Sequence, residues 1–231
     1  MPLFILAVCA VMYLWLQTAD LDSIERRLLS AESIQLSVVR HIQLVSLSTV
    51  IVIVVAVPLG ILLTRPFARP TVPFFLALAN FGQAVPTLGV LVLLALTWGI
   101  GFKGAIVALV LYAVLPVLRN TMVGLRQVDP DVKEAATAMG MGKLRVLFRI
   151  ELPLAVPVIL AGIRTALIIN VGTATIAVLT NAGGLGQIVY SGIVQNRMPV
   201  IIAGSIMTAL FALAVDYVAG VIEELLTPRG I

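Results

Sequence analysis

Charged residues are scarce in this chain, and so are several residue types on which other classes of protein depend. Only 11% of the 231 residues are charged, against about 25% in a soluble domain, while 61% are hydrophobic and the mean hydropathy is +1.13. The single cysteine, Cys9, permits no intrachain disulfide. The sequence contains no metal-ligand cluster, phosphate-binding loop or nucleophile–base pair, which argues against an enzyme. A globule of this size could not bury so many apolar side chains, so the composition predicts an all-α integral membrane protein.

Long apolar segments are abundant, and six of them predict transmembrane helices. They are Leu3–Leu16, Ile42–Leu63, Val72–Leu96, Ala105–Leu125, Leu154–Leu179 and Val200–Leu226. A helix needs about 20 residues to cross the hydrocarbon core, so the first segment is short and could instead be a signal anchor. We find no sign of inverted repeats or discontinuous spans around an ion site, which disfavours a self-sufficient channel or secondary transporter.

The expected organisation is a single membrane domain over residues 1–231. Residues 1–41 would hold the first span and an external segment, and residues 42–226 the core. The polar stretch Gln17–Arg40 would be the longest external segment, part of it a helix lying along the membrane surface.

One polar island, residues 129–151, lies between two of the predicted spans. Asp129 is a good N-cap with Pro130 at the first helical position, and Gly140 and Gly142 should end that helix. A second short helix, Lys143–Glu151, would then end at Pro153. Two short helices at an angle make a knob suited to a cleft in another protein, with Val132, Ala136 and Met139 as its apolar face. Composition alone equally allows an amphipathic loop lying on anionic lipid.

The residue spacing within this island favours the knob. Glu-Ala-Ala is followed after three residues by Gly, after nine more by Ile, and then by Leu-Pro. This spacing resembles the EAA signature of bacterial ABC-importer permeases. The resemblance implies cytoplasmic coupling helices over residues 129–151 that dock on an ATPase subunit. The implied coupling residues are Glu134, Ala135, Ala136, Met139, Gly140, Ile150, Leu152 and Pro153.

The resemblance extends over most of the chain and is closest to the osmoprotectant branch, which transports glycine betaine, choline and carnitine. The segments that carry it are Gln83–Leu88, Leu115–Thr121, Leu152–Pro157, Ala161–Ala166 and Ala182–Gly186. One departure is Thr180-Asn181, where the branch has Ile-Gly. Methionine-type permeases share parts of the pattern, so methionine, another amino acid or a betaine-bearing thiol stays an alternative substrate.

The resemblance also implies a type I ABC-importer permease fold and a set of partners. These are two cytoplasmic ABC ATPase subunits, a second permease subunit (identical or homologous), an extracytoplasmic substrate-binding protein and the lipid bilayer. ATP and Mg would bind to the ATPase, and this chain would hold no cofactor and bind no nucleic acid. The expected location is the bacterial inner membrane.

The distribution of basic residues predicts sidedness. If the Glu134 segment is cytoplasmic, alternation puts both termini inside the cell. The inside segments then hold nine basic residues: Arg65, Arg69, Arg119, Arg126, Lys133, Lys143, Arg145, Arg149 and Arg229. The outside segments hold five: Arg26, Arg27, Arg40, Lys103 and Arg197. This bias follows the positive-inside rule.

Polar residues within the spans are candidates for a translocation path or gate. Arg164 and Asp216 fall at equal depth on sequential spans, so they could pair or could each face a water-filled vestibule. Asn170 and Thr173 could line a pore or serve helix packing, whereas Gly162 and Gly172 favour packing. A turn with a gating role is expected at Asn181, Gly183, Gly184 and Gly186. His41 follows Arg40 at a span entrance, where an interfacial position and a switch are both open.

Overall fold

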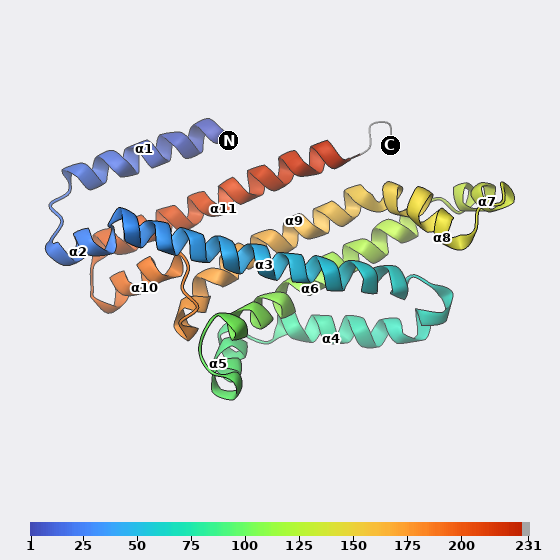
Figure 1. Cartoon of the computed structure of the whole chain (residues 1–231), viewed down its shortest axis with the longest axis horizontal. Helices are drawn as coiled ribbons and strands as arrows, with labels where there is room; N and C mark the ends of the chain where they lie inside the picture. The colour runs from blue at the N-terminus through green and yellow to red at the C-terminus, as the bar shows by residue number, and fades with distance from the viewer. Residues whose placement is uncertain (228–231) are drawn as a thin grey trace.

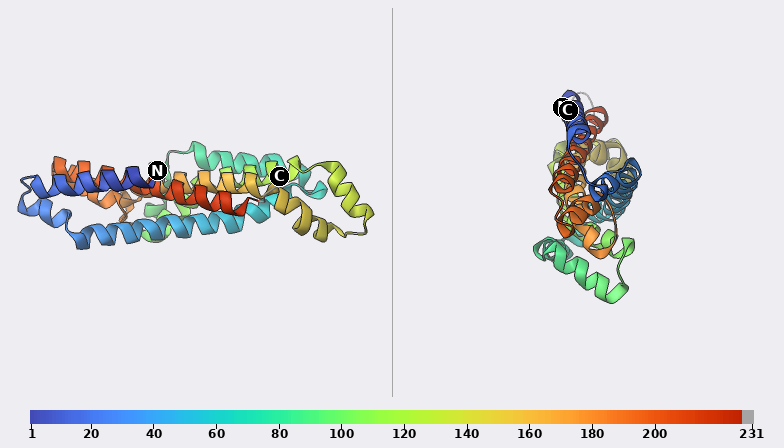
Figure 2. Two further views of the ribbon diagram at one scale, coloured as in Figure 1. Left: turned by 90° about the horizontal axis from the view of Figure 1, so that it is seen from above. Right: turned by 90° about the vertical axis from the view of Figure 1, so that its left-hand side faces the viewer.

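A computed structural model describes residues 1–227, which form an elongated bundle of helices with no strand in this range (Figures 1 and 2). The expectation of an all-α protein is confirmed. Arg229, counted above among the inside basic residues, lies outside the described residues. The first half of the chain holds α1 (Pro2–Thr18), α2 (Ser23–Leu28), α3 (Ala31–Leu63), η1 (Pro66–Thr71), α4 (Val72–Ala84), α5 (Thr87–Trp98) and α6 (Phe102–Gln127). The second half holds α7 (Pro130–Ala138), α8 (Lys143–Val146), η2 (Leu147–Glu151), α9 (Leu152–Ile176), η3 (Ala177–Thr180), α10 (Gly186–Val194) and α11 (Met198–Leu226).

Four helical stretches are long and apolar enough to cross a membrane, and a bent pair of helices raises the number to five. The four are α3, α6, the continuous helix from α8 through η3, and α11. The first predicted span, Leu3–Leu16, corresponds to α1, an apolar helix of 17 residues that is shorter than the membrane core requires. Figure 1 shows α7 and α8 at one end of the bundle, and α2 and α10 at the other.

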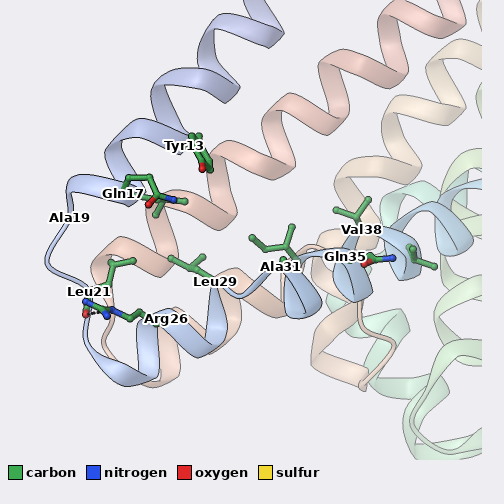
Figure 3. A pocket seen from close by; sticks show the side chains of 12 residues that line it. Tyr13, Gln17, Ala19, Leu21, Arg26, Leu29, Ala31, Gln35 and Val38 are labelled. Carbon is green, nitrogen blue, oxygen red and sulfur yellow. Dashed lines mark hydrogen bonds between the residues drawn. The ribbon is translucent and has the colours of Figure 1, made fainter.

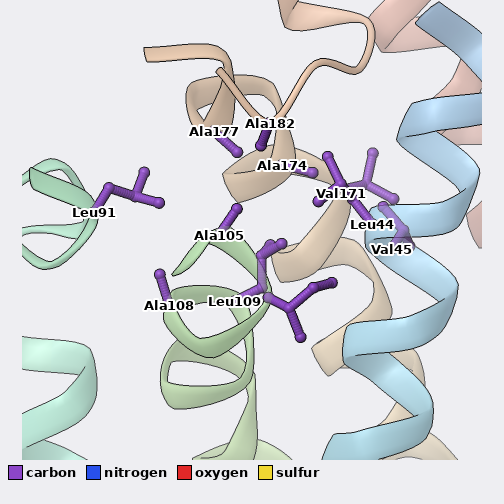
Figure 4. Close-up of a cluster of buried hydrophobic side chains, with 11 residues drawn as sticks. Leu44, Val45, Leu91, Ala105, Ala108, Leu109, Val171, Ala174, Ala177 and Ala182 are labelled. Atoms are coloured by element: carbon purple, nitrogen blue, oxygen red, sulfur yellow. The ribbon is translucent and has the colours of Figure 1, made fainter. Parts of the chain in front are cut away.

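The core is built where α3, α6 and α9 pack against one another. Glycines let their backbones approach closely: a Cβ at Gly162 of α9 would lie 2.6 Å from Asn120 of α6, and one at Gly60 of α3 would lie 2.8 Å from Thr121. The predicted packing role of Gly162 is confirmed. A Cβ at Gly172 would meet no atom within 4 Å, so Gly172 packs against no other helix within the described part of this chain. Figure 4 shows the buried cluster at these helices, including Leu44, Leu109 and Val171.

The predicted span Val72–Leu96 is not one straight helix, because α4 and α5 meet at an angle of 94°. The break falls at Val85 and Pro86, where proline has no N–H and holds the preceding residue in an extended conformation. The Tyr112 hydroxyl donates to the carbonyl of Val85, and Gln83 Nε2 donates to the carbonyl of Tyr112 at 2.8 Å. The first bond satisfies the carbonyl that the break frees, and the second satisfies a carbonyl that Pro116, four residues after Tyr112, leaves without its helical donor. The 94° bend contradicts the expectation of no discontinuous span.

The predicted external segment Gln17–Arg40 is more helical than expected. It contains the short helix α2, begun by a capping box between Asp22 and Glu25, and α3 already starts at Ala31. Ser30 caps α3 by accepting from Ser33 N–H, so this helix begins eleven residues before the expected Ile42, and the external location of its first turns stays a prediction. A cavity of about 870 Å³ separates α1 from α2 and the first turns of α3 (Figure 3).

Candidate functional site

The knob begins with the helix that the sequence predicts. The Asp129 side chain accepts from the backbone N–H of Asp131 at 2.8 Å, and Pro130 occupies the first turn. The helix α7 ends at Ala138, and Gly140 follows with φ +83°. This left-handed conformation costs a residue with a Cβ about 1–2 kcal/mol, which explains glycine at this point. The predicted cap and break are confirmed.

Large apolar side chains of the knob are exposed at the tip of the molecule. Met139, Leu144 and Phe148 have 73%, 72% and 64% of their surface accessible. Ala136 is buried by its own chain, so the predicted apolar face of Val132, Ala136 and Met139 is wrong at its centre. The exposed apolar surface instead continues from α7 into α8 and η2. We define the knob as residues 130–151 and its apolar tip as Met139, Leu144 and Phe148.

The second helix of the knob runs directly into the core of the bundle. The segment Lys143–Glu151 does not stop at Pro153, because a π-turn, η2, joins α8 to α9. Pro153 lies just after this π-turn and inside the continuous helix, so the expected stop is wrong. Ile150, Leu152 and Pro153 are half-buried at this junction, whereas Glu134 and Ala135 are exposed on α7.

A partly buried ion pair joins this junction to the C-terminal end of α3. Arg65 Nη2 lies 2.6 Å from Glu151 Oε2, and Arg65 Nε also donates to the carbonyl of Ile61 at 3.3 Å. Glu151 is buried. The knob is therefore attached to two of the three core helices, α9 through the chain and α3 through this pair. We saw no signal for the pair in the sequence, because its members are 86 residues apart.

Arg164 and Asp216 form an ion pair, which is the first of the two arrangements that the sequence allows. Arg164 Nε and Nη2 donate to the two Asp216 oxygens at 2.7 and 3.0 Å, in a bidentate arrangement. Arg164 Nη1 also donates to Glu223 Oε2 at 3.2 Å. The sequence reading missed Glu223, although it lies seven residues after Asp216 and therefore on the same face of α11. The cluster is partly exposed and carries one carboxylate more than guanidinium.

Asn170 and Thr173 lie inside the chain, where they pack between helices. Asn170 is fully buried, and its Nδ2 donates to Thr49 Oγ1 of α3 at 2.9 Å. Thr173 is also buried. Of the two roles left open by the sequence, this geometry matches helix packing.

The predicted turn is present at the end opposite the knob, between η3 and α10. Asn181, Gly183 and Gly184 have φ of 57°, 81° and 92°, so the chain reverses in left-handed conformations. A Cβ at Gly186 would lie 1.9 Å from the carbonyl oxygen of Thr175, because α10 begins in direct contact with α9. We call residues 181–186 the glycine loop. Its turn is confirmed, and its gating role stays a prediction.

A further ion pair joins the start of α2 to the start of α11. Arg197, just before α11, places Nη1 at 2.6 Å from Asp22 Oδ2 at the start of α2. The pKa of the Asp22 carboxyl lies below its ordinary value of 3.8, chiefly because the backbone N–H of Glu25 donates to it. The Ile24 N–H and the Arg197 charge act in the same direction.

The described residues thus form a bundle of membrane-length helices with an exposed helical knob at one end. Comparison with known families gives the class of protein. Residues 56–229 match the family described as binding-protein-dependent transport system inner membrane component. The chain belongs to this family, and it is a multi-pass inner-membrane component of such a system.

Similar curated proteins cover most of the chain. It is 42% identical over 192 residues to the osmoprotectant import permease protein OsmY of Salmonella typhimurium. The aligned region covers 83% of this chain and 81% of that protein. It is 39% identical to the carnitine transport permease protein OpuCD of Listeria monocytogenes, over 82% and 84% of the two chains. It is 38% identical to the choline transport system permease protein OpuBB of Bacillus subtilis, over 82% and 87%.

Solved structures agree on the fold. An inward-facing conformation of the MetNI methionine ABC transporter superposes with a TM-score of 0.75 and covers 87% of this chain and 100% of its own. Its sequence identity of 24% supports the fold alone. The type I importer permease fold implied by the EAA resemblance is confirmed.

Proposed function

We propose that this chain is the membrane permease subunit of an ATP-driven importer for small quaternary-ammonium or betaine-type solutes. The observation that carries the proposal is the match to osmoprotectant, carnitine and choline permease proteins at 38–42% identity over more than four-fifths of each chain. The chain would supply the pathway, and a partner ATPase would bind ATP and Mg. A substrate-binding protein would deliver the solute from outside.

We further propose that the knob docks on the ATPase subunit. Three large apolar side chains at its tip are exposed on a polar part of the chain, where no other part of the described chain covers them. The glutamate and alanines of the EAA spacing lie on α7 beside this tip. Movement of the ATPase would reach α9 through the continuous helix and α3 through the Arg65–Glu151 pair.

The remaining features of the arrangement are part of the same proposal. Both termini would be cytoplasmic, with the glycine loop outside, and the chain would form a single membrane domain. Two permease subunits, identical or homologous, would form the pore, because two ATPase domains must close on one another. The Arg164–Asp216–Glu223 cluster, partly exposed on one subunit, would face this pathway.

Uptake by the reconstituted complex tests the proposal. This chain, its ATPase and its binding protein are placed in proteoliposomes loaded with ATP, and uptake of labelled glycine betaine is measured. Unlabelled betaine, carnitine or choline should compete, whereas methionine and a betaine-bearing thiol should not. Competition by methionine alone would assign the chain to an amino-acid importer of the same class, and ATP-independent uptake would refute the importer itself.

A further inference from the structure

His41 is the one histidine of the sequence, and it is fully buried rather than interfacial. Its place on α3 sets it against the glycine loop, 144 residues later in the chain. The Nδ1 atom accepts a hydrogen bond from the backbone N–H of Leu185 at 3.3 Å. The imidazole also meets the ring of Phe211 on α11 edge to face, with 5.0 Å between the ring centroids. One side chain thus contacts both the glycine loop and α11.

The glycine loop is shaped to receive this imidazole. A Cβ at Gly184 would lie 3.0 Å from His41 Nδ1, so any side chain there would push the ring away from Leu185. Leu185 itself is buried in a small apolar cluster with Ile188 and Val200. Two contacts therefore hold the loop in place: the buried Leu185 side chain and the hydrogen bond from Leu185 N–H to His41 of α3. We call this position of the loop its seat.

The contact with the glycine loop is the last of three polar contacts that tie α3 to α9 and its flanks. At the knob end, Arg65 pairs with Glu151 immediately before α9. In the middle, Thr49 accepts from Asn170 within α9. At the opposite end, His41 accepts from Leu185, beyond the end of α9. Both ends of the α9 region therefore contact α3 or the residues that directly follow it.

We infer that His41 is a positioning residue that holds the glycine loop in its seat through Nδ1, so that the loop moves with α3. The movement would open the outer end of the pathway when the knob is displaced, and this part of the inference rests on the proposed function. The hydrogen bond itself requires a neutral imidazole with its proton on Nε2, because Nδ1 must be free to accept.

Two substitutions separate the hydrogen bond from the ring. His41→Asn places an amide oxygen close to the position of Nδ1 and can still accept from Leu185. His41→Phe keeps a ring against Phe211 but has no acceptor. Each is combined with Ala182→Cys, a buried position in the glycine loop, in the Cys9→Ser background. Labelling of that cysteine by an impermeant thiol reagent reports how often the loop leaves its seat.

The phenylalanine variant should label about 3- to 10-fold faster than the parent, the effect of losing one hydrogen bond. The asparagine variant should label within about 2-fold of the parent. Equal rates in all three proteins, or an asparagine variant as fast as the phenylalanine variant, would overturn the inference. Labelling needs no transport, so this result stands even if uptake of osmoprotectants fails and the proposed function falls.

A measurement on the unsubstituted chain covers the case in which a variant does not fold. Because His41 is the only histidine, the ¹⁵N spectrum of histidine-labelled protein, purified without a polyhistidine tag, reports this one imidazole. We expect a single neutral tautomer with the proton on Nε2. A proton on Nδ1, or the averaged signal of a freely exchanging imidazole, would contradict the contact with Leu185.

Discussion

The two ends of α9 are both rich in glycine, but the glycines are exposed at the knob end and tightly packed at the glycine-loop end. At the knob end, small residues and glycines leave the backbone uncovered, and a Cβ at Gly140 or Gly142 would meet no atom within 4 Å. At the glycine-loop end, a Cβ at Gly186 would meet the carbonyl oxygen of Thr175 at 1.9 Å. One end exposes Leu144 and Phe148, while the other buries Leu185.

The difference indicates which contacts stabilise each end. The glycine loop is held by contacts within this chain, so changes there should be felt in the folding of the isolated subunit. The knob has an incomplete surface, so changes at its tip should be silent until the partner is present. Glycine alone does not distinguish these cases. What distinguishes them is whether an added side chain meets protein or empty space.

The largest effect is expected at the closed end. Gly186→Ala would force a methyl group into the backbone of α9, at a cost above the ~1–3 kcal/mol typical of overpacking. Folded yield and thermal stability in detergent should fall sharply. The matched control is Gly172→Ala in α9, where no atom lies within 4 Å of the new methyl group. Equal stability of the two variants would break the comparison.

The Arg65–Glu151 pair should give the next largest effect, since it joins the knob to the core. Glu151→Ala leaves Arg65 without its partner, which costs up to about 3–5 kcal/mol for a fully buried pair and less here because Arg65 is partly exposed. The double variant with Arg65→Ala should recover part of the loss. Chemical unfolding of both variants, with exposed Arg69→Ala as control, measures this. Additive losses would mean that the pair does not couple the two helices.

At the open end, Gly140→Ala should be milder and should act on docking. The φ of +83° costs an alanine about 1–2 kcal/mol, which is local strain in an exposed turn. The subunit should insert and fold, while the amount of ATPase retained on purification should drop. Gly142→Ala, with φ −69°, is the control and should behave like the parent. A Gly140→Ala subunit that fails to fold would show that the turn is needed by the bundle itself.

The smallest effect is expected at the Asp22–Arg197 pair. Because the folded-state pKa of Asp22 is lowered, its carboxylate adds stability above its ordinary pKa of 3.8, and this contribution is lost as the pH falls through the folded-state value. Asp22→Asn should therefore melt slightly earlier than the parent at pH 7, and the two should converge below about pH 4. A constant difference down to pH 3 would exclude ionisation of Asp22 as the cause.

Local features of this molecule were predictable, while contacts between distant segments were not. The cap at Asp129, the break at Gly140 and the turn at Gly183 depend on neighbouring residues, and the sequence predicts all three. The Arg164–Asp216 pair was accessible because depth along two helices can be counted. The bend at Pro86 needed Tyr112 to satisfy Val85, and the burial of His41 needed Leu185 beside it. These partners lie far away in sequence, so only the fold identifies them.

Docking of the knob is the central claim, and co-purification of the ATPase tests it most directly. The permease is expressed with its ATPase, and Leu144→Gln and Phe148→Gln are combined. Burial of such a side chain in an interface contributes about 1.5–3 kcal/mol, so retained ATPase should fall by more than about tenfold while permease levels in the membrane stay unchanged. Phe67→Gln, an equally exposed aromatic outside the knob, should retain the ATPase. Full ATPase retention and ATP-driven uptake in the double variant would contradict the account.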